Sequence, residues 1–121
     1  MVILDANIIL RYLLNDNQEM ADAAETHILS GNAQVTVEVI AEVVYVLKGI
    51  YSLERYEIAK TLSDFLDLVN CQEKSVLNIA LAEFGDRNLD FVDCVLFGYH
   101  KVKGAEIATF DKKLLKLIEN K

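Results

Sequence analysis

The sequence predicts an α/β protein: a three-layer α/β/α sandwich with a mainly parallel central sheet, formed by residues 1–121 as a single domain. Short apolar stretches of strand length alternate with longer segments whose apolar residues recur every three or four positions, the spacing of one helix face. Strands that alternate with helices form βαβ units, and the resulting parallel sheet is covered by helices on both faces. No Pro- or Gly-rich linker interrupts the pattern.

The composition excludes several classes. At 53% hydrophobic and 26% charged residues the chain is globular, and a net charge of −7 argues against a basic domain that coats nucleic acid. Acidic residues that hold a divalent cation would still be compatible with this charge. Cys71 and Cys94 lack a zinc-ligand pattern and are predicted to be reduced thiols. With no signal sequence and no apolar run of membrane length, we expect a soluble, cytoplasmic protein.

In the first half of the chain, an apolar strand ends at Asp5 and a helix follows through Leu14. A second helix with its apolar face from Met20 to Ile28 precedes a predicted strand at Gln34–Val37. The segment Glu38–Gly49 is apolar at nearly every position. This pattern predicts a helix that is buried on most sides.

In the second half, Ser52 is expected to cap a helix whose apolar positions run from Ile58 to Val69. A short strand at Asn70–Gln72 and a strand at Glu106–Phe110 complete the predicted sheet. Between them lie two helices, the first with Leu77, Ala80, Leu81 and Phe84 inward and the second with Val92, Val95, Leu96, Tyr99 and Val102 inward. A closing helix over 112–119 is expected to bury Leu114, Leu115 and Ile118.

Acidic residues stand where predicted strands end or helices begin. Asp5 and Asp111 each lie between a strand and a helix, where an N-cap explains one acid as well as a ligand does. In an open α/β sheet, however, such positions line the crevice that binds ligands. Asp90 is predicted to be a structural cap, whereas Asp93, one turn inside the helix, is the functional candidate.

Glu42 lies in the middle of the helix expected to be buried. A buried carboxylate costs several kcal/mol unless it is paired, protonated or bound to a metal. A salt bridge to Arg11 or Lys48 is the structural alternative to a metal-binding role. If Asp5, Glu42, Asp93 and Asp111 converge, each close pair repels by about 4 kcal/mol at an effective dielectric constant near 20. Mg²⁺ or Mn²⁺ would relieve this repulsion.

Four motifs resemble the PIN domain, specifically the VapC-type toxin ribonucleases: DANIILRYLL at 5–14, VIAEVVYVL at 39–47, DFVDCVL at 90–96 and ATFDKKL at 108–114. The resemblance implies a metal-dependent endoribonuclease with Asp5, Glu42, Asp93 and Asp111 as its acidic quartet. Asp5 and Asp93 are the expected direct ligands, and Glu42 and Asp111 would bind a second ion or act through water.

The same resemblance implies a homodimer, an antitoxin protein that inhibits the enzyme, and RNA as substrate. Asn7 is expected to position water or a substrate oxygen, and Arg11 to contact RNA. Lys112, Lys113 and Lys116 are candidates for phosphate contacts, although lysines on a terminal helix are more often its solvated face.

Two other interpretations compete with the nuclease. A PIN-like binding module would keep the acids for stability or for contact with RNA or a protein partner, and would cleave nothing. A receiver domain that forms an aspartyl phosphate would need a lysine on its last strand, and residues 106–110 contain none. His27 and His100 have no ligand spacing and are expected to be ordinary surface or boundary residues.

Overall fold

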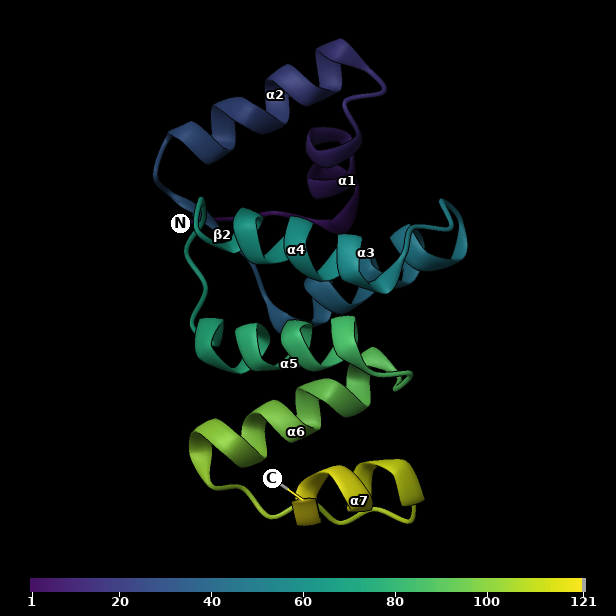
Figure 1. Ribbon diagram of the computed structural model, residues 1–121. Helices are drawn as coiled ribbons and strands as arrows, with labels where there is room; N and C mark the ends of the chain where they lie inside the picture. The colour runs from purple at the N-terminus through teal and green to yellow at the C-terminus, as the bar shows by residue number, and fades with distance from the viewer. Residues whose placement is uncertain (121) are drawn as a thin grey trace.

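The structure, a computed structural model, describes residues 1–120; Lys121, the last residue of the predicted domain, lies outside the described residues. Two strands, β1 (Val2–Ile3) and β2 (Ala33–Gln34), pair in parallel with Val2 opposite Ala33 and Ile3 opposite Gln34. Asn70 forms a single parallel bridge beside Gln34. The predicted parallel pairing is therefore confirmed, within a fold that consists mostly of helices (Figure 1).

Helices account for most of residues 1–120: α1 Ala6–Leu14, α2 Gln18–Leu29, α3 Val37–Gly49, α4 Arg55–Leu66, α5 Lys74–Asp86, α6 Phe91–Lys103 and α7 Lys112–Asn120. Helices α1 and α2 lie at one end of the molecule and α7 at the other, with α5 packed between α4 and α6 (Figure 1). Among these helices none is both long and apolar enough to cross a membrane.

Local chemistry explains where several helices begin and end. The side chains of Asp5, Asn17 and Thr36 accept hydrogen bonds from the backbone N–H three residues later, at the starts of α1, α2 and α3. Gly104 ends α6 with φ +67°, a left-handed conformation that glycine adopts without steric cost.

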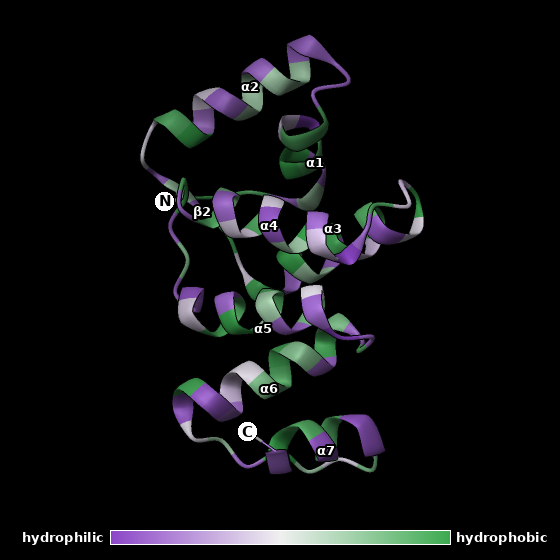
Figure 2. Ribbon diagram, in the orientation of Figure 1, coloured by the Kyte–Doolittle hydropathy of each residue, from purple (hydrophilic) through white to green (hydrophobic). Residues whose placement is uncertain are grey.

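The hydrophobic core joins the inner faces of α1 and α3–α7, and α2 adds Ile28 to it. Hydrophobic residues dominate α1, whereas they alternate with hydrophilic ones along α2 and α4 (Figure 2). The predicted inward faces of α4 and α5 are confirmed except at Val69, which lies beyond the end of α4 and is half-buried. The other predicted residues are all buried: Ile58, Leu62, Phe65, Leu66, Leu77, Ala80, Leu81 and Phe84. Burial of such side chains contributes roughly 1.5–3 kcal/mol each, which holds the helices together.

The predicted strand at Glu106–Phe110 is wrong. Residues 104–110 have no regular structure, and the side chain of Phe110 is fully exposed. The start of this segment is tied to the end of α6 instead, since Ala105 N–H donates to the Tyr99 carbonyl (3.5 Å) and the Ala105 carbonyl lies 2.9 Å from Nδ1 of His100. Hydrogen bonds to a helix end thus replace the pairing that a strand requires.

Two predicted boundaries are also wrong. The second strand ends at Gln34 rather than Val37, because the Thr36 hydroxyl caps α3 and Val37 is already helical. Ser52 caps nothing: it has φ +54°, and α4 begins only at Arg55.

The buried stripe of α6 is rotated from its predicted position. Phe91, Cys94, Val95, Phe97 and Gly98 are buried, whereas Val92 and Val102 are exposed. Gly98 faces α5, where the absence of a side chain lets the two backbones approach closely. On α7, Leu114 and Leu117 are buried while Leu115 is exposed and Ile118 is half-buried. The apolar residues of α6 and α7 are compatible with more than one buried face, and tertiary packing determines which face is buried.

Candidate functional site

Asp5 lies directly after β1 and caps α1. Its Oδ1 accepts a hydrogen bond from the Ile8 backbone N–H at 2.9 Å, and the residue is exposed. The N-cap explanation is therefore confirmed for Asp5. The cap uses only one oxygen of the carboxylate, because Oδ2 makes no hydrogen bond within residues 1–120. Asn7, in the first turn of α1, is also exposed.

Asp111 occupies the same position at the start of α7. Its Oδ1 accepts from the Leu114 backbone N–H at 2.9 Å, and its own N–H donates to the Thr109 hydroxyl at 3.0 Å. A carboxylate at a helix N-terminus is stabilised by the helix dipole. As at Asp5, one oxygen makes the cap and the other is available to a ligand.

Asp93 lies in the first turn of α6 and is half-buried. Burial raises the pKa of its carboxyl group, and the negative charges of Asp111 and then Asp90 raise that pKa further. Helices α6 and α7 pack together and both begin on the same side of the molecule (Figure 1). The structure thus brings Asp93 and Asp111 into one electrostatic environment.

Asp90 adds to this environment in a way that the sequence did not predict. It occupies the N-cap position of α6, but its side chain makes no capping hydrogen bond. The prediction of a structural cap is therefore correct for its backbone and wrong for its side chain. Its carboxylate is instead a third negative charge that acts on Asp93.

Glu42 is exposed on α3, so the expectation that it is buried is wrong. The buried face of α3 consists of Ile40, Val43, Val44 and Leu47, and Glu42 lies off this face. Within residues 1–120 it forms an ion pair with neither Arg11 nor Lys48. An exposed carboxylate needs no counter-charge, which removes the desolvation argument for Glu42 as a metal ligand.

Arg11 is already engaged. Its Nη1 donates to both carboxylate oxygens of Asp16, at 2.9 and 2.8 Å, and its Nη2 donates to the Tyr51 hydroxyl at 3.4 Å. Contact with RNA would require Arg11 to give up or share the Asp16 ion pair. The structure therefore weakens the case for Arg11 at the site.

The four predicted acids do not form a complete metal cluster. In the part of the chain that the structure describes, no three His, Cys, Asp or Glu side chains lie close enough together to hold a metal ion. The donor chemistry nevertheless fits a hard divalent cation. Asp93 and Asp111 are carboxylates whose mutual repulsion a cation would relieve, and Oδ2 of Asp111 makes no hydrogen bond to another of residues 1–120. The convergence of Asp5 and Glu42 on this pair stays a prediction.

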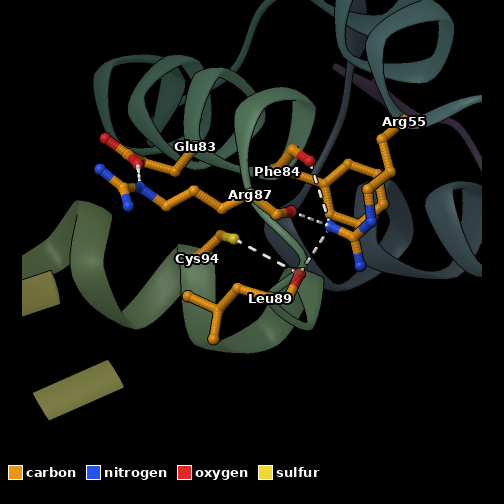
Figure 3. Close-up of polar contacts among 6 residues, drawn as sticks. All are labelled: Arg55, Glu83, Phe84, Arg87, Leu89 and Cys94. Carbon is orange, nitrogen blue, oxygen red and sulfur yellow. Dashed lines mark hydrogen bonds and ion pairs between the residues drawn. The ribbon is translucent and has the colours of Figure 1, made fainter. Parts of the chain in front are cut away.

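Arg55 positions the segment that leads into α6. Its Nη1 donates to the carbonyls of Phe84, Arg87 and Leu89 at 3.1, 2.7 and 2.8 Å, and its guanidinium stacks 4.1 Å from the centre of the Phe84 ring (Figure 3). These carbonyls belong to the end of α5 and to the connection before Asp90. The sequence did not identify Arg55, because its partners lie 29 to 34 positions away.

The thiols are not candidate nucleophiles. Both cysteines are free, as predicted, and burial raises the pKa of Cys94 to about 12. Its Sγ lies 3.8 Å from the Leu89 carbonyl (Figure 3). Cys94 is therefore a protonated core residue at neutral pH. His27 is exposed, and His100 of α6 is half-buried with its Nδ1 2.9 Å from the carbonyl of Ala105 just after the helix, so both histidines are ordinary surface or boundary residues.

Sequence comparison places this geometry in a family. The PIN domain family matches residues 2–120, nearly the full length of the chain. The protein belongs to the PIN domain family, whose members are generally nucleases and typically use divalent metal ions. No curated protein matches the chain, and no solved structure does either.

Proposed function

We propose that this protein is a metal-dependent endoribonuclease that hydrolyses RNA phosphodiester bonds. The observation that carries the proposal is that Asp93 and Asp111 lie at the starts of two packed helices of a PIN domain, where burial and then the negative charge of Asp111 raise the pKa of Asp93. Carboxylates held at the starts of two adjacent helices are a suitable place to bind a divalent cation.

Asp93 and Asp111 would hold Mg²⁺ or Mn²⁺, with Asp5 as a further ligand and Glu42 acting through water. When bound, such a cation lowers the pKa of a water molecule and neutralises charge on the phosphate and leaving oxygen. Asp5 and Asp111 are oriented by their capping bonds, which leave Oδ2 of each side chain for this role. Asn7 would position the attacking water. No side-chain nucleophile is required.

The test is cleavage of single-stranded RNA by Asp93→Asn and Asp111→Asn. Each substitution should lower the Mg²⁺-dependent rate by about a hundredfold or more, since it removes a charged ligand. Chelation of the metal should abolish cleavage by the wild type. Asp86→Asn, at an exposed acid at the end of α5, is the matched control and should cleave at the wild-type rate. A double variant of Asp93 and Asp111 that cleaves as fast as wild type would refute the assignment.

We further propose that the protein is the toxin of a toxin–antitoxin pair, acting in the cytoplasm as a homodimer that an antitoxin protein inhibits. The resemblance of residues 5–14, 39–47, 90–96 and 108–114 to VapC-type toxins supports this proposal. The same resemblance supports the three-layer α/β/α arrangement around a mainly parallel sheet. Growth arrest on induction, relieved by a small protein encoded beside the gene, is the expected result.

A catalytically silent PIN-like module is the second candidate, and the exposure of Glu42 favours it over a fully assembled quartet. Such a module would bind RNA or a protein partner and leave RNA intact. The cleavage assay separates the two, because a silent module gives the same uncut RNA with the wild type and with Asp93→Asn.

A further inference from the structure

A concave site of about 470 Å³ lies between α7 and the connection from α5 to α6. Its lining residues are Arg87, Asn88, Leu89, Lys113, Lys116, Leu117 and Asn120. None of these lining residues, all within the described part of the chain, is acidic. A site lined by three cations is unexpected in a protein whose net charge is −7, and it points to an anionic ligand.

Two of the cations, Arg87 and Lys113, are held by side-chain contacts. Lys113 and Lys116 are three positions apart on α7 and so lie on the same side of the helix. Lys113 Nζ donates to the Asn88 carbonyl at 3.3 Å, which attaches α7 to the opposite wall. Buried Leu89 and Leu117 form an apolar floor.

Arg87 supplies the third cation from the opposite wall. Its Nε forms an ion pair with Oε2 of Glu83 at 2.6 Å (Figure 3). The Glu83 carboxylate offsets one positive charge, whereas neither lysine forms an ion pair with another of residues 1–120. The lysines therefore dominate its attraction for anions.

The site is continuous with the candidate acids along the chain. Asn88 and Leu89 directly precede Asp90, and Lys113 follows Asp111 by two residues. An RNA strand that approaches Asp93 and Asp111 meets repulsion from their carboxylates. Cations on the same two segments supply the attraction that the acids lack.

We propose that Arg87, Lys113 and Lys116 bind the phosphodiester backbone of single-stranded RNA beside the cleavage site. This inference rests on the proposed ribonuclease function and assigns part of the substrate path. The rim cations contact phosphate oxygens, and the apolar floor packs against a sugar or base. Lys113 and Lys116 are therefore binding residues and not only the solvated face of a terminal helix.

The test measures binding of a fluorescent single-stranded RNA of about ten nucleotides by the full chain carrying Asp93→Asn, so that the RNA is not cut. Lys113→Gln with Lys116→Gln should raise Kd about tenfold and reduce the slope of log Kd against log[NaCl] by about 1.4, the value for two lost phosphate contacts on a single strand. Lys113→Arg with Lys116→Arg keeps both charges and should retain the Kd of the parent.

Lys48→Gln with Lys60→Gln is the matched control: it removes the same charge from exposed positions that do not line the site, and its Kd and slope should stay near those of the parent. The proposal would be overturned if Lys113→Gln with Lys116→Gln had the same Kd and slope as the parent. It would also be overturned if the control lost as much RNA affinity as that variant. Absence of RNA binding by the parent would overturn it too. If inorganic phosphate displaces short and long RNAs equally well, the site is instead one that binds a small anion.

The cleavage assay is independent of this measurement. If the wild type cleaves RNA but Lys113→Gln with Lys116→Gln does not weaken RNA binding, the nuclease proposal stands and the assignment of the cationic site fails. If the wild type does not cleave RNA but the same double variant binds RNA more weakly, the cationic site belongs to a binding module.

Discussion

Arg55 shows how one side chain can determine the local geometry beside the candidate site. Three backbone carbonyls accept hydrogen bonds from one guanidinium nitrogen (Figure 3). Two of them, those of Arg87 and Leu89, lie in the connection between α5 and α6, which is neither helix nor strand. The bonds to Phe84 and Leu89 are part-buried, and a carbonyl withdrawn from water is costly to leave without its charged donor. Arg55 therefore fixes the path of the chain into Asp90 and Asp93.

Arg55→Ala should lower the free energy of unfolding by about 2–4 kcal/mol, since it leaves these carbonyls without their charged donor and removes the stacking on Phe84. Urea denaturation followed by circular dichroism measures this change. Lys60→Ala is the control, because its exposed ion pair with Asp64 contributes only about 0.5 kcal/mol. Similar stability of the Arg55 variant and the control would show that the contacts in Figure 3 do not hold the connection.

The raised pKa of Asp93 has a defined effect on stability. Ionising a group whose pKa is higher in the folded than in the unfolded state costs folding free energy, and this cost grows as pH rises from the ordinary value of 3.8 through the folded-state pKa. Asp93→Asn removes the cost. The variant should gain Tm over wild type at pH 7, and the gain should shrink as pH falls through the folded-state pKa toward 3.8 and be absent below that value.

Thermal unfolding from pH 3 to pH 8 tests this prediction, with Asp86→Asn as the control that removes an exposed carboxylate at the end of α5. Added Mg²⁺ should raise the Tm of the wild type at pH 7 more than that of Asp93→Asn, since ligand binding stabilises the folded state. A difference in Tm that is the same at every pH would contradict the electrostatic explanation.

Among the helices, the contact of α5 with α6 matters most for the site, because it sets where α6 begins. A Cβ added at Gly98 would lie 2.6 Å from the Val76 carbonyl oxygen, which is backbone and cannot move aside easily. The missing side chain thus permits the close approach of the two helices. The same contact determines which face of α6 is buried, and hence that Asp93 lies at the margin of the interface.

Gly98→Ala should destabilise the protein by about 1–3 kcal/mol through overpacking. Gly49→Ala is a matched control at the end of α3, where an added Cβ meets nothing within 4 Å, and it should be neutral or stabilising by up to about 1 kcal/mol. Urea denaturation of both variants measures the difference. If Gly98→Ala were as stable as the control, the close packing of α5 on α6 would be excluded.

For the whole molecule, exposed apolar side chains support the proposed homodimer. Tyr45, Ile50 and Tyr56, around the connection from α3 to α4, are 62%, 73% and 69% exposed. These three exposed apolar side chains lie within twelve positions of one another in the chain, and exposed apolar surface is a candidate for protein–protein contact. Light scattering after size exclusion should give a mass twice the 13.6 kDa of one chain, and 1 M NaCl should not dissociate it, because apolar contacts are not screened by salt. Only monomer over a wide concentration range would count against the dimer.

The sequence by itself predicted the family, the order of most helices and the local role of several residues. A repeat of apolar residues every 3.6 positions predicts a helix with one buried face. For α4 and α5 the residues that this repeat places inward are buried in the structure. Capping depends on neighbours three residues apart, so the caps at Asp5 and Asp111 follow from short-range chemistry.

Only the tertiary structure decided which faces and charges meet. Glu42 was expected to be buried because α3 is apolar at nearly every position, but packing on one side leaves it exposed. The segment 106–110 has strand-forming residues, yet its start bonds to the end of α6. Arg55, the charge of Asp90 on Asp93, and the cationic site of Lys113 and Lys116 depend on contacts between residues far apart in the chain. Such contacts leave no periodic signal, because the chain must fold before these groups become neighbours.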